Sequence, residues 1–304
     1  MVSTDDGVLL FGGSTAPPPS GGKILFDTWT FRPDQGWILR AACPPPPFGT
    51  AIAYDAESNR VILFGTVVST QPAGPAPETA ETWSFDPSTR VWTNMNPVGG
   101  PERLFAPAMA YDAGSDRVIM FGGNNTSGQV GGTWAYDVNT NTWTQMDPAD
   151  KPAQRAFMHL AYDSQSDRVI LVGGGNCCRD FGDTWSYDFD TDTWTEMAPG
   201  GGPPAISYGA SAYDPGTDRV ILFGGAPYAQ GEAPQADTWA YDYETNTWTL
   251  LSPPSAPPAR GWHALARDPV SGLLVLFGGG PDREHYQADT WLYDPVANTW
   301  TEVE

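Results

Sequence analysis

A Thr-Trp pair recurs six times along the chain at nearly constant spacing. The tryptophans of these pairs lie 51 to 54 residues apart, at Trp29, Trp83, Trp134, Trp185, Trp239 and Trp291. A second tryptophan follows each of them eight or nine residues later, at Trp37, Trp92, Trp143, Trp194, Trp248 and Trp300. An apolar run ending in Gly precedes every pair, for example VILFGG at 220–225. A period of this length indicates a repeat architecture, in which each unit buries its apolar surface against its neighbours.

Each repeat is expected to form four short strands. The repeat that begins at residue 156 reads AFMHLAYD, turn SQSD, RVILVGG, a loop, DTWSYD, turn FDTD and TWTEM. Segments rich in β-branched and aromatic residues, separated by turn formers, are typical of an antiparallel meander. A four-stranded sheet with two apolar faces is buried only when copies stack around an axis. The sequence therefore predicts an all-β fold, a single six-bladed β-propeller over 1–304, with blades near 1–40, 48–95, 105–146, 156–197, 207–250 and 261–304.

These motifs together resemble the kelch repeat. An apolar run closes on Gly-Gly, Asp-Thr-Trp-x-Tyr-Asp follows after a loop, and a second Trp completes a unit of about 50 residues. The resemblance covers the whole chain and extends to the repeats of the galactose oxidase central domain. Departures are Thr66 for the second Gly, Val172 for Phe, and Arg267 for the Tyr before Asp. The kelch family includes binding modules, scaffolds and a few enzymes, so the resemblance implies the fold and leaves the activity open.

The innermost strand of blade one is expected to be truncated or missing. When the repeats are aligned on Phe-Gly-Gly, Met1 falls level with Tyr54, near the end of the corresponding strand of blade two. The Asp6-Gly7 pair suits a tight hairpin with a stub at Met1 to Thr4. Three explanations remain open: the stub suffices, the natural polypeptide continues upstream of Met1, or a neighbouring molecule adds a strand and forms an assembly.

Composition excludes some classes of partner. With 15 basic and 36 acidic residues the formal net charge is −21, which is unsuited to non-specific nucleic-acid binding. No apolar run approaches the ~20 residues needed to span a bilayer, and no secretion signal follows Met1. We expect an acidic extracellular or cell-surface protein that binds a protein partner or a second copy of itself, with carbohydrate as another candidate ligand.

One face of the propeller should carry the binding residues. The connections between the second and third strands, and those between blades, are long and irregular, whereas the other turns are short and uniform. Irregular loops on a rigid scaffold are common binding surfaces. Arg155 and Arg260 occupy equivalent positions and could either hold a carboxylate or sulfate or each tie down a neighbouring loop carbonyl or aspartate. The candidate binding residues are Arg155, Phe157, Tyr208, Arg260, Trp262, His263, Arg283, His285 and Tyr286, on a face that also includes Phe48, Phe105 and Tyr228.

The sequence favours a non-catalytic module over an enzyme. His159 and His263 differ by one position in their repeats, so strand alternation points them in different directions, and we predict no metal, no cofactor and no catalytic residue. Asp188, Asp190 and Asp192 are interpreted as turn residues. The chain lacks the extra blade and ligand domain of kelch-type copper oxidases, and it lacks the Gly of sialidase Asp boxes. A carbohydrate-active enzyme (epimerase, lyase or sialidase-like) at the channel mouth around Arg155, Tyr208, Arg260, Trp262 and His263 remains the alternative.

Cysteine and asparagine add two local features. Cys177 and Cys178 are adjacent in a loop of blade four and would form a vicinal disulfide in an oxidising compartment, or remain free thiols or a metal site. Cys43 would then be an unpaired thiol. Asn124 and Asn125 begin overlapping glycosylation sequons.

Overall fold

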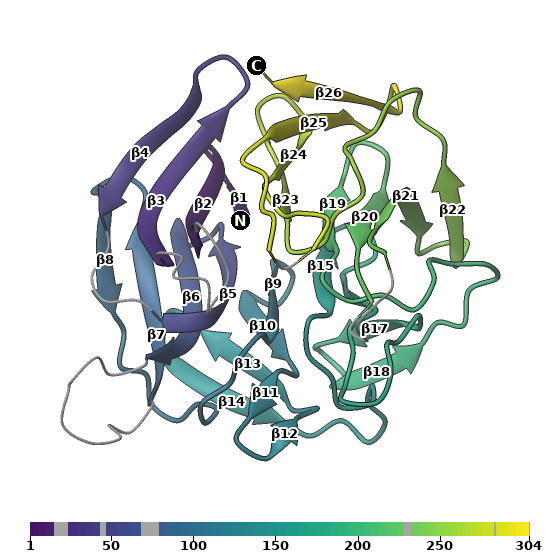
Figure 1. Cartoon of the computed structure of the whole chain (residues 1–304). Coiled ribbons are helices and arrows are strands. Elements are labelled where there is room, and N and C mark those ends of the chain that lie inside the picture. The colour runs from purple at the N-terminus through teal and green to yellow at the C-terminus, as the bar shows by residue number, and fades with distance from the viewer. Residues whose placement is uncertain (15–23, 43–46, 68–78, 228–232, 283, 304) are drawn as a thin grey trace.

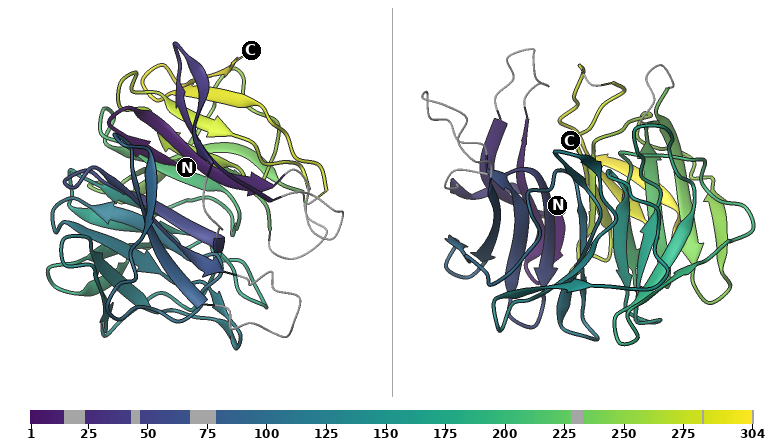
Figure 2. Two further views of the ribbon diagram at one scale, coloured as in Figure 1. Left: turned by 90° about the vertical axis from the view of Figure 1, so that its left-hand side faces the viewer. Right: turned by 90° about the horizontal axis from the view of Figure 1, so that it is seen from below.

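The computed structural model describes residues 1–14, 24–42, 47–67, 79–227, 233–282 and 284–303. These residues form six four-stranded antiparallel sheets arranged in a ring, which confirms the predicted six-bladed β-propeller. Blade one (purple) and blade six (yellow) lie side by side and complete the ring, with the N-terminus near its centre (Figures 1 and 2).

Strands pair in chain order within each blade, so every blade is a contiguous meander. The first three blades are β1 (Val2–Thr4), β2 (Gly7–Ser14), β3 (Ile24–Arg32) and β4 (Gly36–Ala42); β5 (Pro47–Asp55), β6 (Arg60–Val67), β7 (Thr79–Asp86) and β8 (Val91–Asn94); and β9 (Ala108–Asp112), β10 (Arg117–Phe121), β13 (Thr133–Asp137) and β14 (Thr142–Met146). The last three are β15 (His159–Asp163), β16 (Arg168–Val172), β17 (Thr184–Asp188) and β18 (Thr193–Glu196); β19 (Ala210–Asp214), β20 (Arg219–Gly225), β21 (Gln235–Asp242) and β22 (Thr247–Leu251); and β23 (Ala264–Arg267), β24 (Leu274–Phe277), β25 (Thr290–Asp294) and β26 (Thr299–Val303). A small hairpin of β11 (Asn124–Asn125) and β12 (Gly128–Gln129) extends blade three.

The innermost strand of blade one is the expected stub. Strand β1 has three residues, whereas β9, β15 and β19 have five each. It pairs Val2 with Leu9 and Thr4 with Gly7, and the Thr4 hydroxyl donates to the Gly7 carbonyl over 2.9 Å. A two-residue turn at Asp5 and Asp6 therefore folds this short strand back onto β2, so the predicted tight hairpin is present with its turn one residue earlier than the Asp6-Gly7 pair indicated.

The core consists of apolar clusters between adjacent blades. Between blades two and three, for example, Ile62 and Phe64 pack with Val118, Met120 and Trp143. Between blades one and six, the cluster contains Val8, Phe31, Ala266 and Val275, with Trp37 packed against it. Because each sheet buries both faces in this way, inner strands such as β10 and β16 are nearly continuous apolar runs, like those that precede each Thr-Trp pair in the sequence.

The Thr-Trp motif holds neighbouring blades together. In each blade the indole Nε1 of the second tryptophan donates to the threonine hydroxyl of the preceding blade, over 2.9 to 3.0 Å, in the pairs Trp37–Thr290, Trp92–Thr28, Trp143–Thr82, Trp194–Thr133, Trp248–Thr184 and Trp300–Thr238. The first of these pairs spans the seam between blades one and six. In the described part of the chain no strand is exchanged across that seam, so side chains close the ring there.

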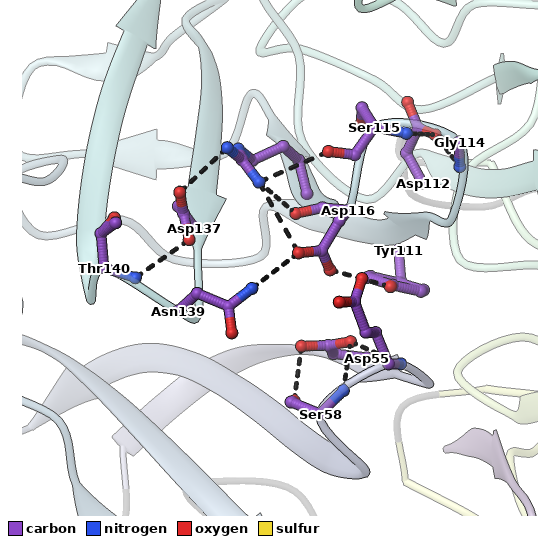
Figure 3. A network of polar contacts seen from close by, with 12 residues as sticks. Asp55, Ser58, Tyr111, Asp112, Gly114, Ser115, Asp116, Asp137, Asn139 and Thr140 are labelled. Atoms are coloured by element: carbon purple, nitrogen blue, oxygen red, sulfur yellow. Dashed lines mark hydrogen bonds and ion pairs between the residues drawn. The ribbon is translucent and has the colours of Figure 1, made fainter.

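Acidic residues organise the turns on one face, which we call the lower face (Figure 3). The Asp112 carboxylate accepts hydrogen bonds from the Gly114 and Ser115 amides over 3.0 and 3.1 Å. Asp116 accepts from the Tyr111 hydroxyl over 2.9 Å, and Arg117 pairs with Asp137 at 2.9 Å. The Asp188 turn follows the same pattern, since its carboxylate accepts from the Thr191 amide and pairs with Arg168. Aspartates in this chain therefore serve largely as turn acceptors.

Candidate functional site

The six blades surround a central channel whose upper part is the candidate site. The upper face carries the β10–β13, β16–β17, β20–β21 and β24–β25 connections and the links between blades. Beneath its mouth lies a cavity of about 220 Å³ lined by Met109, Met158, His159 and His263, among others. A second cavity of about 270 Å³ continues towards the lower face, where Arg267 and tyrosines line it. The channel is thus lined by both apolar and polar groups, with two histidines near its upper end.

Four aromatic side chains from successive blades form an arc around the channel mouth, which we call the aromatic collar. Its members are Phe105, Phe157, Tyr208 and Trp262. Ring centroids are 6.4 Å apart for the first pair, 4.5 Å for Phe157 and Tyr208, and 4.9 Å for Tyr208 and Trp262. Phe105 is 42% exposed and Tyr208 8% exposed, so the collar has a buried centre and an accessible edge.

The collar is held in an uncommon backbone conformation. Phe157, Tyr208 and Trp262 have φ angles of 58°, 58° and 60°, and Ala106 occupies the same position in blade three at 53°. A non-glycine residue at such an angle costs about 1–2 kcal/mol. In this conformation the backbone amide of each collar position donates a hydrogen bond to the carbonyl of the equivalent position in the previous blade. The Trp262 amide, for example, donates to the Tyr208 carbonyl over 2.8 Å. Strained aromatic residues gathered at one opening are typical of functional sites.

Arg155 and Arg260 lie behind the collar and brace their own blades. Both are fully buried. Arg155 donates to the Ala153 and Gly173 carbonyls over 2.9 and 3.0 Å and forms a bidentate pair with Asp183. Arg260 repeats the arrangement with Pro258, Gly278 and Asp289. Of the two alternatives raised by the sequence, the structure shows these guanidinium groups tying down loops.

The carboxylates of Asp183 and Asp289, which pair with these arginines, have lowered pKa values. Burial alone would raise the pKa of Asp183, but the hydrogen bonds and charge of Arg155, with a further hydrogen bond from the Trp185 indole, hold it below its usual value. The pKa of Asp289 is lowered in the same way by Arg260 and Trp291. Sequence reasoning missed these two aspartates, although each stands in the Asp-Thr-Trp motif of the same blade as its arginine.

Blade three provides a natural control for the brace, because Leu104 and Gly132 replace the arginine and the aspartate there. We expect Arg155→Leu alone to lower the free energy of unfolding by about 3 kcal/mol, since it leaves a largely buried carboxylate unpaired. The double variant Arg155→Leu with Asp183→Gly should recover at least half of that loss. Urea denaturation of both variants measures the difference, and a double variant no more stable than the single one would contradict the brace.

The two channel histidines lie in different environments: His263 is buried, and His159 is partly buried with its Nε2 atom covered. His263 packs edge-on against Phe223 of the preceding blade at 5.4 Å, and neither of its ring nitrogens has a hydrogen-bond partner among the described residues. His159 Nε2 also lacks a hydrogen-bond partner within that part of the chain. This nitrogen lies close to Gly209, at 3.4 Å from the position that a Cβ atom would take there. Burial lowers the pKa of His159 to about 4 and, together with the charges of His159 and Arg260, that of His263 to about 3. Both are thus neutral at ordinary pH.

The remaining candidate residues lie away from the collar or outside the residues that the structure describes. His285 is exposed and its Nδ1 lies 2.9 Å from an Asp282 carboxylate oxygen. Tyr286 is 37% exposed on the same connection. Arg283, Tyr228 and Cys43, and the side chain of Phe48, lie outside the described residues. Within the described ranges no group of three or more His, Cys, Asp or Glu could hold a metal ion.

Cys177 and Cys178 sit on the upper face as two exposed free thiols whose sulfur atoms are 2.8 Å apart. The nearby hairpin β11–β12 carries the sequon residues, and there the Asn125 side chain accepts from the Ser127 amide over 2.8 Å. The Cys177 amide donates to the Gln129 side chain of that hairpin over 3.4 Å. The backbone of the turn that carries the thiols therefore connects blade four to blade three.

Comparison with known proteins is consistent with this architecture. The KLHDC2/KLHL20/DRC7 Kelch-repeats domain model matches residues 1–225. Adagio protein 3 of Arabidopsis thaliana is 24% identical over 259 residues, which cover 79% of this chain and 40% of that protein. Kelch domain-containing protein 3 of Homo sapiens is 27% identical over 244 residues, covering 72% and 61%. Galactose oxidase of Gibberella zeae is 24% identical over 256 residues, covering 81% and 36%.

The aligned region spans between 36% and 61% of the length of these three relatives. No helix in the described part of the chain is long and apolar enough to span a membrane. Kelch-repeat propellers generally serve as protein-binding modules. On the matched family model and the six repeats, this chain belongs to the Kelch-repeat family of β-propellers.

Proposed function

We propose that this propeller is a non-catalytic binding module that docks a protein segment on the aromatic collar. The observation that carries the proposal is the collar itself: three stacked aromatic residues held at positive φ in consecutive blades. Glycine adopts this conformation without strain, and blade three has the small Ala106 at the equivalent position, so the backbone does not require large rings there. Retaining large rings there at an energetic cost indicates selection for their surface.

Chemistry at the rim supports a protein partner. Aromatic residues and arginine are enriched in protein interfaces, and the upper face offers Phe105 at 42% and Tyr286 at 37% exposure. Nearby, Arg179 stacks over Phe181 at 4.6 Å. The net charge of −21 favours association with a basic segment at low salt. The two guanidinium groups that a carbohydrate-active enzyme would use here are occupied by Asp183 and Asp289.

Selection from a displayed random-peptide library tests this function. Peptides enriched on the intact chain should lose at least about tenfold in affinity, equivalent to ~1.4 kcal/mol, when Trp262 is replaced by glycine. The substitution removes the ring but relieves the positive φ, so we expect the stability to change by less than about 2 kcal/mol. Val296→Ser is the matched control and should leave binding unchanged, because Val296 is 81% exposed in a turn of the lower face.

Two outcomes would overturn the proposal. One is the absence of enriched peptides, particularly if the same preparation binds polysaccharides on a glycan array, which would favour a carbohydrate ligand. The other is a set of peptides whose binding is insensitive both to Trp262→Gly and to Phe157→Gly. Each variant is first shown to be folded by its urea transition.

Location outside the cytoplasm and self-association are further parts of the proposal. The acidic composition supports the first, and immunodetection in cell fractions tests it. For the second, β1 already pairs with Gly7, Val8 and Leu9, so a strand from another copy would add beside the remaining residues of β2. Sedimentation that shows only monomer at micromolar concentration would exclude strand addition.

A further inference from the structure

Cys177 and Cys178 occupy the tip of a tight turn on the upper face. The Asn176 side-chain oxygen accepts from the amides of Cys178 and Arg179 over 3.0 and 3.1 Å. The Asn176 amide donates to the Arg179 carbonyl over 2.9 Å. This turn presents both thiols to solvent with their sulfur atoms 2.8 Å apart. Small oxidants can therefore reach both sulfurs, and the sulfurs can reach each other.

The turn is connected to the collar on both sides. Gly175 bridges to Ala156, the residue before Phe157. On the far side, the Asp180 carboxylate accepts from the Ser207 hydroxyl over 2.6 Å, and Ser207 precedes Tyr208. A change in the backbone of this turn therefore acts on the segments that hold two of the collar rings.

We propose that Cys177 and Cys178 form a reversible thiol–disulfide site that rearranges this turn. The co-reactant is a low-molecular-weight disulfide. One cysteine thiolate attacks a sulfur of that disulfide, forming a mixed disulfide and expelling the other half as a thiolate. The second cysteine thiolate then attacks the protein sulfur of the mixed disulfide, closing the Cys177–Cys178 bond and releasing the second small thiol. Two protein thiols are oxidised while one small disulfide is reduced to two thiols, which take up the two protons.

Ring closure must move the backbone. Consecutive Cα atoms are about 3.8 Å apart across a trans peptide, whereas disulfides are usually found with Cα atoms about 4.4–6.8 Å apart. A bond between adjacent cysteines therefore distorts the peptide that joins them, and it competes with the amide hydrogen bonds to Asn176 and Gln129. A strained disulfide of this kind is also more easily reduced than a relaxed one, which makes the site reversible.

Mass spectrometry and hydrogen exchange on the intact chain test this inference without any partner. After treatment with oxidised glutathione, we expect wild type to lose the mass of two hydrogens within the 173–183 peptide and to regain it with dithiothreitol. Cys178→Ser should instead accumulate a glutathione adduct, and Cys43→Ser should behave as wild type. Amide exchange at Cys178 and Arg179 should speed up at least about tenfold on closure.

A second probe reports the geometry of the reduced pair. Phenylarsine oxide condenses with two thiols and releases water, so wild type should retain one arsenic atom after a monothiol wash and Cys178→Ser none. Stable glutathione adducts on the 173–183 peptide of wild type, or closure with unchanged amide exchange in 173–183, would overturn the inference. The thiol–disulfide site stands by itself, and only its effect on partner binding rests on the proposed docking function. Failure of the docking function would show separately, as peptide binding that is insensitive to Trp262→Gly.

Discussion

Replacing Trp37 by alanine lowers the free energy of unfolding by about 3 kcal/mol and opens the ring at the seam between blades one and six. This indole donates to the Thr290 hydroxyl over 2.9 Å, and its ring lies 5.0 Å from both Phe31 and Phe277. The variant loses these contacts at the one interface between blades that are distant in the sequence. We therefore expect fast hydrogen exchange in β1, β2 and β24 under conditions in which blades three to five stay protected.

The matched control is Trp248→Ala. That indole makes the same hydrogen bond to Thr184, but blades four and five are also joined directly by the chain. We expect at least as large a loss of stability, because Trp248 is only 6% exposed, without selective exchange in blades one and six. If the two variants gave the same exchange pattern, the seam would have no special role in closing the ring.

Acidification from pH 7 to pH 4 removes several kcal/mol of stability through His159 and His263. Their pKa values in the folded chain are about 4 and about 3, against about 6.5 in an unfolded chain. Between these values the unfolded state binds more protons than the native state, so stability falls as the pH falls. The stabilisation that each neutral histidine contributes is complete above pH ~6.5. At ~1.4 kcal/mol per pKa unit, roughly 3 kcal/mol or more of it is lost for each histidine when the pH has fallen to that histidine's pKa in the folded chain.

Urea denaturation at a series of pH values measures this effect. The variant His159→Gln with His263→Phe carries no ionisable group at either position and should lose most of the dependence between pH 6.5 and 4. His285→Gln removes an exposed histidine and should leave the dependence as in wild type. Acid sensitivity that persists unchanged in the double variant would assign it to carboxylates such as Asp183 and Asp289, whose pKa values are also shifted.

Pairs of residues within one hairpin were accessible to sequence reasoning. Tyr111 bonds Asp116, and Tyr136 bonds Asn141, each five residues away and across a tight turn. Where blade six has Arg267 in place of the tyrosine, the turn residue is Gly272. Such pairs depend on local geometry, which recurs in every repeat and can be read by aligning the repeats.

Contacts between blades were less accessible. The Trp–Thr hydrogen bonds join residues more than 60 positions apart, and 253 apart for Trp37 and Thr290. The motif was evident in the sequence, but its role depends on which sheets become neighbours in the ring. The stacking of the collar depends on the same neighbour relations, so the sequence named Phe157, Tyr208 and Trp262 as binding candidates without showing that they meet. Each stands six residues before the aspartate at, or directly after, the end of the first strand of its blade.

By itself the sequence determined the number of blades, the four-stranded meander and the short first strand, because local strand and turn preferences repeat with the period of the blade. Only the tertiary structure decided that Arg155 and Arg260 face inward to Asp183 and Asp289, and that three aromatic residues converge on the channel mouth. Those outcomes depend on how the strands curve and on which loop covers which side chain. Burial and convergence are properties of the closed ring, and no single repeat encodes them.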